Sequence, residues 1–344
     1  CRYCFQKSGL SGVDCIKTKD IQRILEFFKG KQNGGEKYLQ LTGGEPFLRQ
    51  DLPEIIKIFA EKDFEVRLQT NGLLATEEKV KDVIDAGLRD VTISLDTLDP
   101  EKQDFICNAK GTWNKIIKSL SLFSKYLPQK GAMSMVNTVV SKFNITEIPQ
   151  VIRFTTKIGF YNSVIPIHLS TTPGFIVRKE AEPFAFTQED HQTIDKTYNT
   201  LIEMKKQGYH VHNTYKFLKG STEFLKYRKI YWECDSPNLY FSISPQGFFL
   251  PCVDLKGEKS MLDPDFLNVY KSKEFQQKIR QQVKSCPGCM YACYPEISYL
   301  CKNPIVLFER TLQGLKISRK KREIYSYEEM LKIAEEIRNG KDEH

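Results

Sequence analysis

Short runs rich in β-branched residues alternate with helical segments over the first half of the chain, from about residue 36 to residue 169. Strands are expected at 38–41, 66–70, 91–95, 133–140 and 164–169, and helices near 19–29, 51–61, 76–87, 112–126 and 146–158. Such alternation is typical of parallel βα units, in which the carboxyl ends of the strands share one edge of the sheet. Periodicity alone leaves both a partial barrel and a doubly wound sheet open.

The overall composition allows a large core and excludes some functions. With 344 residues and 40% hydrophobic content, the chain is long enough for one large domain and a smaller one. No apolar run approaches the roughly 18 residues needed to span a bilayer, and no nucleic-acid module is visible. The net charge is +8, with basic residues concentrated at 316–322. That run is either a solvated surface or a docking patch for an acidic partner.

Two short motifs near the start of the chain complement each other. The first is Cys1-Arg2-Tyr3-Cys4, and a Cys-x-aromatic-Cys pair suits thiolate ligation of iron and sulfur. The second is Gly43-Gly44-Glu45-Pro46, which follows an apolar strand and offers main-chain polar groups and a carboxylate to a charged ligand. The alternative is that the two thiols are ordinary cysteines or half of a zinc site.

Together these motifs resemble those of the radical S-adenosylmethionine (radical SAM) enzymes. In that family a Cys-x3-Cys-x2-Cys loop supplies three thiolates to a four-iron four-sulfur cluster, and the open iron binds the amino and carboxylate groups of S-adenosylmethionine. The resemblance makes Cys1 and Cys4 two of the three ligands. It also leads us to expect that the first ligand and the strand preceding it lie before residue 1.

The resemblance implies the fold and the cofactor-binding residues as well. The fold is α/β, a partial (β/α)6 barrel with a small C-terminal α+β auxiliary-cluster domain. Tyr3 matches a position that packs near the adenine in relatives. The residues that match the methionine-ammonium segment are Gly43, Gly44 and Glu45. Relatives contact the ribose and the carboxylate at the positions of Thr70, Asn71, Ser94 and, as a weaker match, Asn137.

Six of the ten cysteines crowd between residues 234 and 301. Their pattern is Cys234-x12-Gly247-x4-Cys252, then Cys286-x2-Cys289-x3-Cys293-x7-Cys301. The segments at 241–244 and 248–252 predict a β-hairpin with a turn at 245–247. The spacing favours metal ligation over disulfides, which indicates a reducing, oxygen-poor cytoplasm.

The first part of this pattern resembles the opening of the SPASM and twitch auxiliary-cluster domains. Because six thiolates cannot complete two clusters with four ligands each, the simpler reading is one auxiliary four-iron cluster. Its ligands would be Cys234, Cys252, Cys286 and Cys289. The surplus Cys293 and Cys301 would ligate a second, incomplete cluster, donate a hydrogen atom or simply pack. A zinc site is the alternative for this half.

Three further residues have no assigned partner in the sequence. Cys15 and Cys107 have no cysteine at a useful spacing and are expected to be small buried or loop residues. His168 falls where the last strand is expected to end. It therefore either faces the substrate or belongs to the core or surface.

The predicted organisation is a barrel at 1–170, a connector and helical segment at 171–230, an auxiliary-cluster domain at 231–306 and a helical tail at 307–344. The resemblance implies an oxidoreductase that cleaves S-adenosylmethionine to a 5′-deoxyadenosyl radical. Its substrate would be a small molecule such as a polyol, sugar or aminocyclitol, with the auxiliary cluster accepting an electron. A ribosomally made peptide is the alternative substrate. A reducing partner such as flavodoxin or ferredoxin is expected, and a non-catalytic iron-sulfur or zinc scaffold is the alternative of another class.

Overall fold

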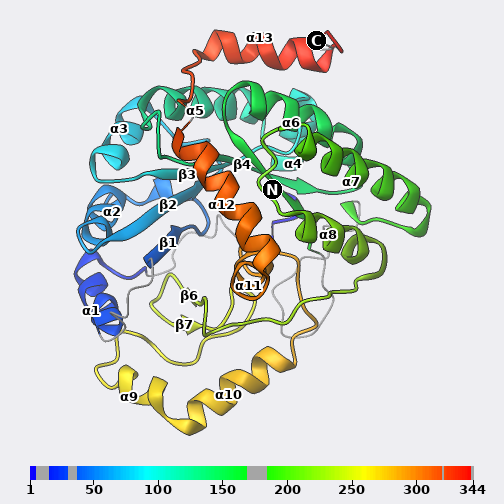
Figure 1. Ribbon diagram of the computed structural model, residues 1–344. Helices are drawn as coiled ribbons and strands as arrows, with labels where there is room; N and C mark the ends of the chain where they lie inside the picture. Colours follow the sequence, from blue (N-terminus) through cyan, green and yellow to red (C-terminus); the bar gives the residue numbers. More distant parts are fainter. Residues whose placement is uncertain (5–14, 30–36, 169–183, 320, 342–344) are drawn as a thin grey trace.

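A five-stranded parallel sheet forms the centre of the protein in the computed structural model, which describes residues 1–4, 15–29, 37–168, 184–319 and 321–341 (Figure 1). The strands lie in sequence order, as expected when each strand is followed by a crossover helix. They are β1 (Lys37–Leu41), β2 (Phe64–Thr70), β3 (Asp90–Ser94), β4 (Ser134–Val140) and β5 (Tyr161–Pro166). The predicted α/β class is confirmed.

Helices cover one face of the sheet and bury its apolar side chains. They are α1 (Thr18–Lys29), α2 (Leu52–Ala60), α3 (Glu77–Asp85), α4 (Pro100–Cys107), α5 (Thr112–Tyr126) and α6 (Ile148–Lys157). Leu68, Ile93 and Val136 from the strands are fully buried in the same core as Ile117 and Phe154 from the helices. Burial of this apolar surface is the main favourable term that holds the layers together.

Side chains that cap their own helices mark where several of these helices begin. Thr76 accepts a hydrogen bond from the backbone of Lys79 at the start of α3, at 3.3 Å. Asp99 accepts one from Lys102 at the start of α4, at 3.0 Å. Each cap satisfies a backbone N–H that the first helical turn leaves unpaired. Of the six helices that cover the sheet, α4 alone was not predicted from the sequence.

The last barrel strand begins and ends earlier than the sequence pattern indicates. The expected strand was 164–169, whereas β5 spans Tyr161–Pro166. Its first residues pair with β4, and two of them, Asn162 and Ser163, are polar but buried in the sheet. His168 therefore lies two residues beyond the strand. Residues 171–183 of the connector and helical segment expected at 171–230 lie outside the described residues.

Two helices follow the barrel strands and form a second core against the edge of the sheet. These are α7 (His191–Lys206) and α8 (Tyr215–Tyr227), preceded by the short helix η4 (Gln188–Asp190). Tyr198 and Leu218 from these helices share a core with Val164 of β5. Both helices lie within the helical segment expected at 171–230.

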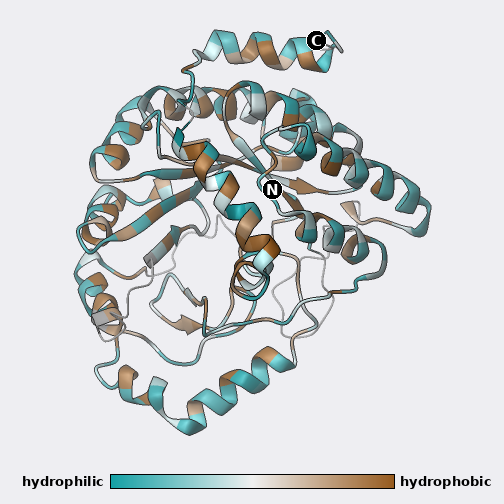
Figure 2. Cartoon of the chain, in the orientation of Figure 1, coloured by the Kyte–Doolittle hydropathy of each residue, from teal (hydrophilic) through white to brown (hydrophobic). Residues whose placement is uncertain are grey.

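The cysteine-rich half contains little regular structure around its thiols. The hairpin predicted there is confirmed as the antiparallel pair β6 (Ser242–Ile243) and β7 (Phe249–Leu250). It is followed by α9 (Phe266–Lys271), α10 (Lys273–Lys284), α11 (Pro295–Lys302) and α12 (Pro304–Arg319). In Figure 2, α10 is largely hydrophilic, whereas the strands of the central sheet carry apolar segments. Phe249 of the hairpin packs with Phe27 of α1, which joins this half to the barrel.

The last helix, α13 (Tyr327–Arg338), packs on α5 and α6 of the barrel. Met330, Ala334 and Ile337 belong to the barrel core. The preceding Arg322 is buried and donates to the carbonyl groups of Ser124 and Leu127, at 2.7 and 3.1 Å. This arginine of the basic run is therefore structural and cannot serve a docking patch. Among the described residues, no helix is long and apolar enough to cross a membrane.

Candidate functional site

A row of polar side chains crosses the sheet, at the ends of β2 and β3 and in the middle of β4 and β5. Ser94 of β3 pairs with Asn137 of β4, and Asn137 pairs with Ser163 of β5. Asn71 follows β2 directly and extends the row by one strand. Residues that are partners in a parallel register point to the same face of the sheet. The predicted residues Asn71, Ser94 and Asn137 are thus brought together.

Ser163 belongs to the same row but was not predicted from the sequence. It lies next to Asn137 and is buried. The signal was present as a serine directly before the apolar residues Val164 and Ile165. It was hidden because the expected strand began at Val164, one residue later.

Glu45 ties the Gly-Gly-Glu-Pro segment to the end of β2. Its carboxylate accepts hydrogen bonds from Thr70 Oγ1 at 2.7 Å, from Asn71 N at 2.8 Å and from Phe47 N at 3.1 Å. The last of these also caps the short helix η1 (Pro46–Leu48). The carboxylate therefore holds the Gly-Gly-Glu-Pro segment against the end of β2. The hydroxyl group of Thr70 is one of its three hydrogen-bond donors.

Gly43 shows that the backbone beside this carboxylate is accessible. Its φ of +144° is a conformation that residues with a side chain rarely adopt. A Cβ atom placed there would meet no other atom within 4 Å. The backbone conformation at this position therefore requires glycine. The open space beside Gly43 would let a ligand approach the main chain closely.

The cysteine motif at the start of the chain reaches the same edge of the sheet. Arg2 N donates to Ile106 O at 2.9 Å, and Cys4 N donates to Cys1 O at 3.1 Å, which folds the motif into a tight turn. Tyr3 donates its hydroxyl hydrogen to Asp96, two residues beyond β3. The tyrosine therefore anchors the thiols of Cys1 and Cys4 at the carboxyl end of the strands.

Asp96 is a buried carboxyl group that sequence reasoning missed. Burial raises its pKa to about 6, and its other oxygen accepts a hydrogen bond from Val139 N at 2.8 Å. Burial also raises the pKa of Tyr3, and the neighbouring Asp96 raises it further, so Tyr3 stays protonated and acts as the donor. The signal in the sequence was a single acidic residue in the apolar stretch 91–98.

Cys107 lies close to this motif, which corrects the expectation that it has no partner. Its sulfur is 3.9 Å from the sulfur of Cys1, and it accepts a hydrogen bond from Gln103 Nε2 at 3.2 Å. Burial raises the pKa of the Cys107 thiol, and Asp96 raises it further. The contact joins residues 106 positions apart and carries no signal in local spacing.

The cysteine-rich segment is held around the hairpin by side-chain contacts. Cys234 Sγ lies 3.5 Å from Tyr240 Oη. Ser236 donates to the carbonyl oxygen of Pro251, which draws the chain after Cys234 toward Cys252. These contacts bring the two cysteines that flank the hairpin toward each other.

Cys289 is buried and has three other thiols in its neighbourhood. Burial raises its pKa, and the neighbouring Cys252, Cys293 and Cys286 raise it further. The pKa of Cys286 is raised by burial and by the nearby Cys234. The four predicted cysteines thus lie near one another, and Cys293, which was thought to be surplus, lies among them.

This arrangement bears on the kind of metal the thiols would hold. Among the residues that the structure describes, no three side chains lie close enough to bind one metal ion. A zinc ion needs its ligands within about 2.3 Å of one centre, whereas thiolates of a four-iron cluster each bind a different iron and lie farther apart. The five neighbouring thiols are therefore candidate ligands of a metal group.

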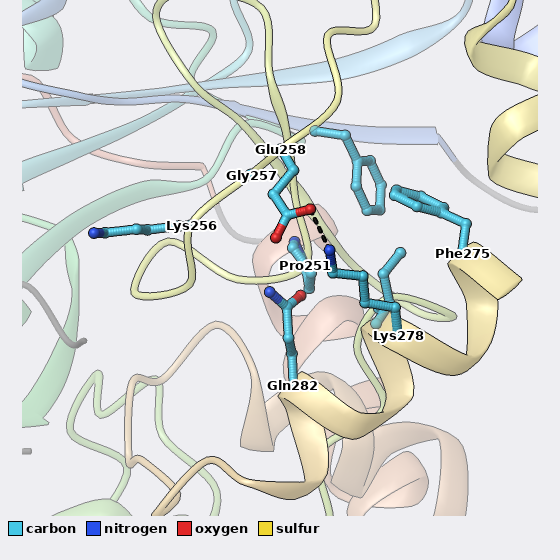
Figure 3. Close-up of a pocket in the computed structure, with 9 residues that line it drawn as sticks. Pro251, Lys256, Gly257, Glu258, Phe275, Lys278 and Gln282 are labelled. Carbon is cyan, nitrogen blue, oxygen red and sulfur yellow. Dashed lines mark hydrogen bonds and ion pairs between the residues drawn. The ribbon is translucent and has the colours of Figure 1, made fainter. Parts of the chain in front are cut away.

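Two hollows elsewhere do not coincide with the strand-end residues. The cavity in Figure 3 holds about 10 Å³, room for about one water molecule, and lies between the hairpin and α10, where Glu258 pairs with Lys278. An open depression of about 530 Å³ is lined by residues of α6 and α7, including Arg153 and Glu203. Neither is lined by a residue of the polar row.

Comparison with known proteins gives one family and several relatives. The family model of the Radical SAM superfamily matches residues 1–155. A probable GTP 3′,8-cyclase of Archaeoglobus fulgidus is 28% identical over 267 residues, which cover 76% of this chain and 84% of the relative. The GTP 3′,8-cyclase of Helicobacter pylori is 31% identical over 229 residues, which cover 63% of this chain and 67% of the relative. In the GTP 3′,8-cyclase of Aliarcobacter butzleri, 32% identical over 163 residues, the match spans 49% of the relative.

Among solved structures, Streptococcus suis SuiB bound to S-adenosylmethionine has a similar fold, with a TM-score of 0.61 and 18% identity. The similarity covers 81% of this chain and 64% of SuiB. SuiB bound to the precursor peptide SuiA has a TM-score of 0.60 and 19% identity. At this level of identity the likeness concerns the fold.

Proposed function

Since the chain belongs to the radical SAM superfamily, we propose that its strand-end site binds S-adenosylmethionine beside a four-iron four-sulfur cluster and opens a C–H bond of a second substrate. When bound, these cofactors supply the radical that takes a hydrogen atom from carbon. The task of the protein is then to hold the cofactor, orient the substrate and exclude water. The observation that carries this proposal is the junction of the cysteine motif, the open glycine and the polar row at one edge of the sheet.

Each part of that junction has a proposed role. Cys1 and Cys4 hold the cluster through their thiolates. The backbone at Gly43 and Gly44 faces the methionine end of S-adenosylmethionine, while Glu45 keeps that backbone in place through its three hydrogen bonds. The side chains of the polar row offer hydrogen bonds to the ribose and the carboxylate; they are Asn71, Ser94 and Asn137, with Ser163 as an addition.

We further propose that the cysteine-rich segment holds one auxiliary four-iron cluster, which accepts an electron when the substrate is oxidised. The proposed ligands are Cys234, Cys252, Cys286 and Cys289, and the electrostatic contact of Cys289 with Cys252 and Cys286 supports this set. Cys293 competes with them because it neighbours both Cys289 and Cys252.

Iron content decides the number of clusters. Anaerobically reconstituted protein that carries all three barrel ligands should hold about eight irons per chain, four for each of two cubane clusters. Replacing Cys301 by Ser should leave that content unchanged, because Cys301 is exposed near the end of α11 and is not among the thiols that neighbour Cys289. A content near twelve that falls by about four on replacing Cys293 or Cys301 would show a second auxiliary cluster.

The proposed substrate is a small molecule whose reactive C–H bond lies on a sugar or a sugar-like ring. The relatives named as GTP 3′,8-cyclases support this class, because GTP carries a ribose. The relative from Archaeoglobus fulgidus matches this chain over 76% of its length and is itself covered to 84%. GTP itself is therefore the first probe.

Peptide modification is the second candidate. It is favoured by the fold of SuiB, whose structure with a precursor peptide aligns with 81% of this chain. A peptide that lies along the strand ends would present backbone amides to the polar row. The two candidates differ in the size and the flexibility of the substrate, which one assay can compare.

The assay measures 5′-deoxyadenosine in anaerobic mixtures of protein, S-adenosylmethionine and dithionite. We expect slow formation without substrate and at least tenfold faster formation with the correct class. The arms are GTP, a panel of sugars and polyols, and peptides encoded beside the gene. Stimulation by a peptide alone would replace the small-molecule proposal, and no 5′-deoxyadenosine in any arm would overturn the proposed function.

A further inference from the structure

One peptide group in the cysteine-rich segment is held at both ends by ring side chains from other parts of the chain. The group joins Cys289 to Met290. Its N–H donates to Nε2 of His168 at 2.9 Å, and its carbonyl oxygen accepts a hydrogen bond from Nε1 of Trp232 at 2.8 Å. Both hydrogen bonds have good length, and together they fix the plane of the peptide.

His168 is built to accept this hydrogen bond. Burial lowers its pKa to about 3, and the nearby Arg228 lowers it further, so the imidazole is neutral at physiological pH. Since Nε2 accepts the N–H of Met290, the ring proton must lie on Nδ1. The ring also stacks on Tyr291, with centroids 4.0 Å apart, and lies 4.9 Å from the ring of Phe224.

The neighbouring residues prevent this peptide from sliding. Met290 is fully buried and packs with Phe217 and Phe224 of α8. Tyr291 donates to Asp254 at 3.4 Å, and Asp254 lies two residues after Cys252. The contacts therefore run from the end of β5, through His168, to the loops that carry Cys289 and Cys252.

We propose that His168 and Trp232 clamp the Cys289–Met290 peptide and thereby set the position of Cys289 relative to the barrel, which makes His168 a positioning residue for the auxiliary cluster. This inference rests on the proposed function, because it takes Cys289 as a cluster ligand. His168 follows the last barrel strand and Trp232 precedes Cys234, so the clamp joins the strand-end site to the second site. Groups that orient metal ligands tune the affinity and the potential of the metal they hold.

The test uses protein in which Cys1 and Cys4 are both replaced by Ala, so that only the auxiliary cluster contributes signal. In this parent we would compare His168→Phe, which keeps a ring but loses the acceptor, with His168→Gln, which keeps an acceptor at similar reach. Trp232→Phe removes the donor on the other side. His191→Gln is the matched control, since His191 lies at the start of α7 and its ring contacts Tyr227.

The readouts are iron per chain and the midpoint potential from titrations followed by electron paramagnetic resonance. We expect His168→Phe and Trp232→Phe each to halve the iron content, or to change the reduction equilibrium about tenfold, about 59 mV for a one-electron couple. His168→Gln should recover at least half of the change, and the control should match the parent. If His168→Phe does not fold, Trp232→Phe provides the same test.

Two negative outcomes can be told apart. A parent without iron would overturn the auxiliary cluster of the proposed function, and the clamp with it. The other case is a parent that holds about four irons per chain. If its iron content and midpoint potential are then unchanged in His168→Phe and Trp232→Phe, the clamp alone is overturned.

Discussion

The strand-end site and the cysteine-rich segment are built in different ways. At the strand ends, the backbone register places Ser94, Asn137 and Ser163 side by side, and a core of strands and helices lies directly beneath them. In the second region, residues 286–294 contain no helix or strand, and the thiols are placed by contacts such as those of His168 and Trp232. The first site is therefore set by secondary structure, whereas the second depends on contacts between side chains.

The largest effect that separates the two regions is expected from Cys4→Ala. Cys4 belongs to the turn anchored by Tyr3 at the strand ends, so its loss should abolish cleavage of S-adenosylmethionine and leave the auxiliary iron in place. The measurements are 5′-deoxyadenosine formation and iron content, with Cys301→Ala as the control that should retain both. Cleavage that survives in Cys4→Ala under reducing conditions would mean that the radical chemistry is wrongly assigned.

Removal of iron is expected to loosen the second region far more than the first. Metal binding and folding are coupled where ligands are held by loops. After treatment with a chelator and an oxidant, amides at 286–294 should exchange with deuterium at least tenfold faster. Amides of β3 and β4 should keep their protection, because the sheet holds them. If deuterium exchange became faster by the same factor in both regions, the cysteine-rich segment would not depend on iron more than the sheet does.

Asp96 gives the strand-end site a pH dependence that can be measured in the protein without clusters. Its folded pKa of about 6 lies above the ordinary value of 3.8, so its contribution to stability is complete below about pH 3.8 and is lost as the pH rises through 6. The expected loss by pH 7.5 is roughly 3 kcal/mol. Urea unfolding from pH 4.5 to 7.5 should show this decline in the native sequence and a flatter profile in Asp96→Asn. Parallel profiles would show that Asp96 titrates normally.

A smaller effect is expected at Gly44, where the backbone faces the proposed cofactor. Gly44→Val should weaken S-adenosylmethionine binding about tenfold, because a side chain blocks close approach to the main chain. Equilibrium binding in the presence of the barrel cluster measures this. Gly314→Val is the control, since Gly314 is exposed on α12 and a Cβ atom there meets nothing within 4 Å. Unchanged affinity in Gly44→Val would count against this placement of the methionine end.

Much of the barrel could be predicted because its pattern is local. Four of the five strands begin and end within two residues of the expected positions, and the hairpin at 242–250 was expected from its turn at 245–247. The fifth strand was placed three residues late, since its buried polar residues Asn162 and Ser163 interrupt the apolar run. The helices at 215–227, 266–271 and 273–284 were not predicted, although the buried Phe217, Leu218 and Phe224 of the first recur at helical spacing.

The side-chain contacts of the site were beyond sequence reasoning for a similar reason. Tyr3 and Asp96 are 93 positions apart, and Cys1 and Cys107 are 106 positions apart. The hydrogen bond of His168 to Met290 spans 122 positions. Each depends on the packing of separate elements, so neither spacing nor composition indicates it. The motifs predicted the candidate site residues, whereas the side-chain contacts that position those residues are visible only in the fold.

The packing of α13 on the barrel affects the order in which the protein can fold during its synthesis. Met330, Ala334 and Ile337 complete the same core as residues of β2, β3 and α6. A ribosome that adds about 5–20 residues per second needs on the order of ten to thirty seconds to proceed from the last of those elements to α13. During that interval the thiols of the cysteine-rich segment emerge beside a core that is still open. If these thiols hold the proposed auxiliary cluster, iron and sulfur can therefore reach them before the barrel core is complete.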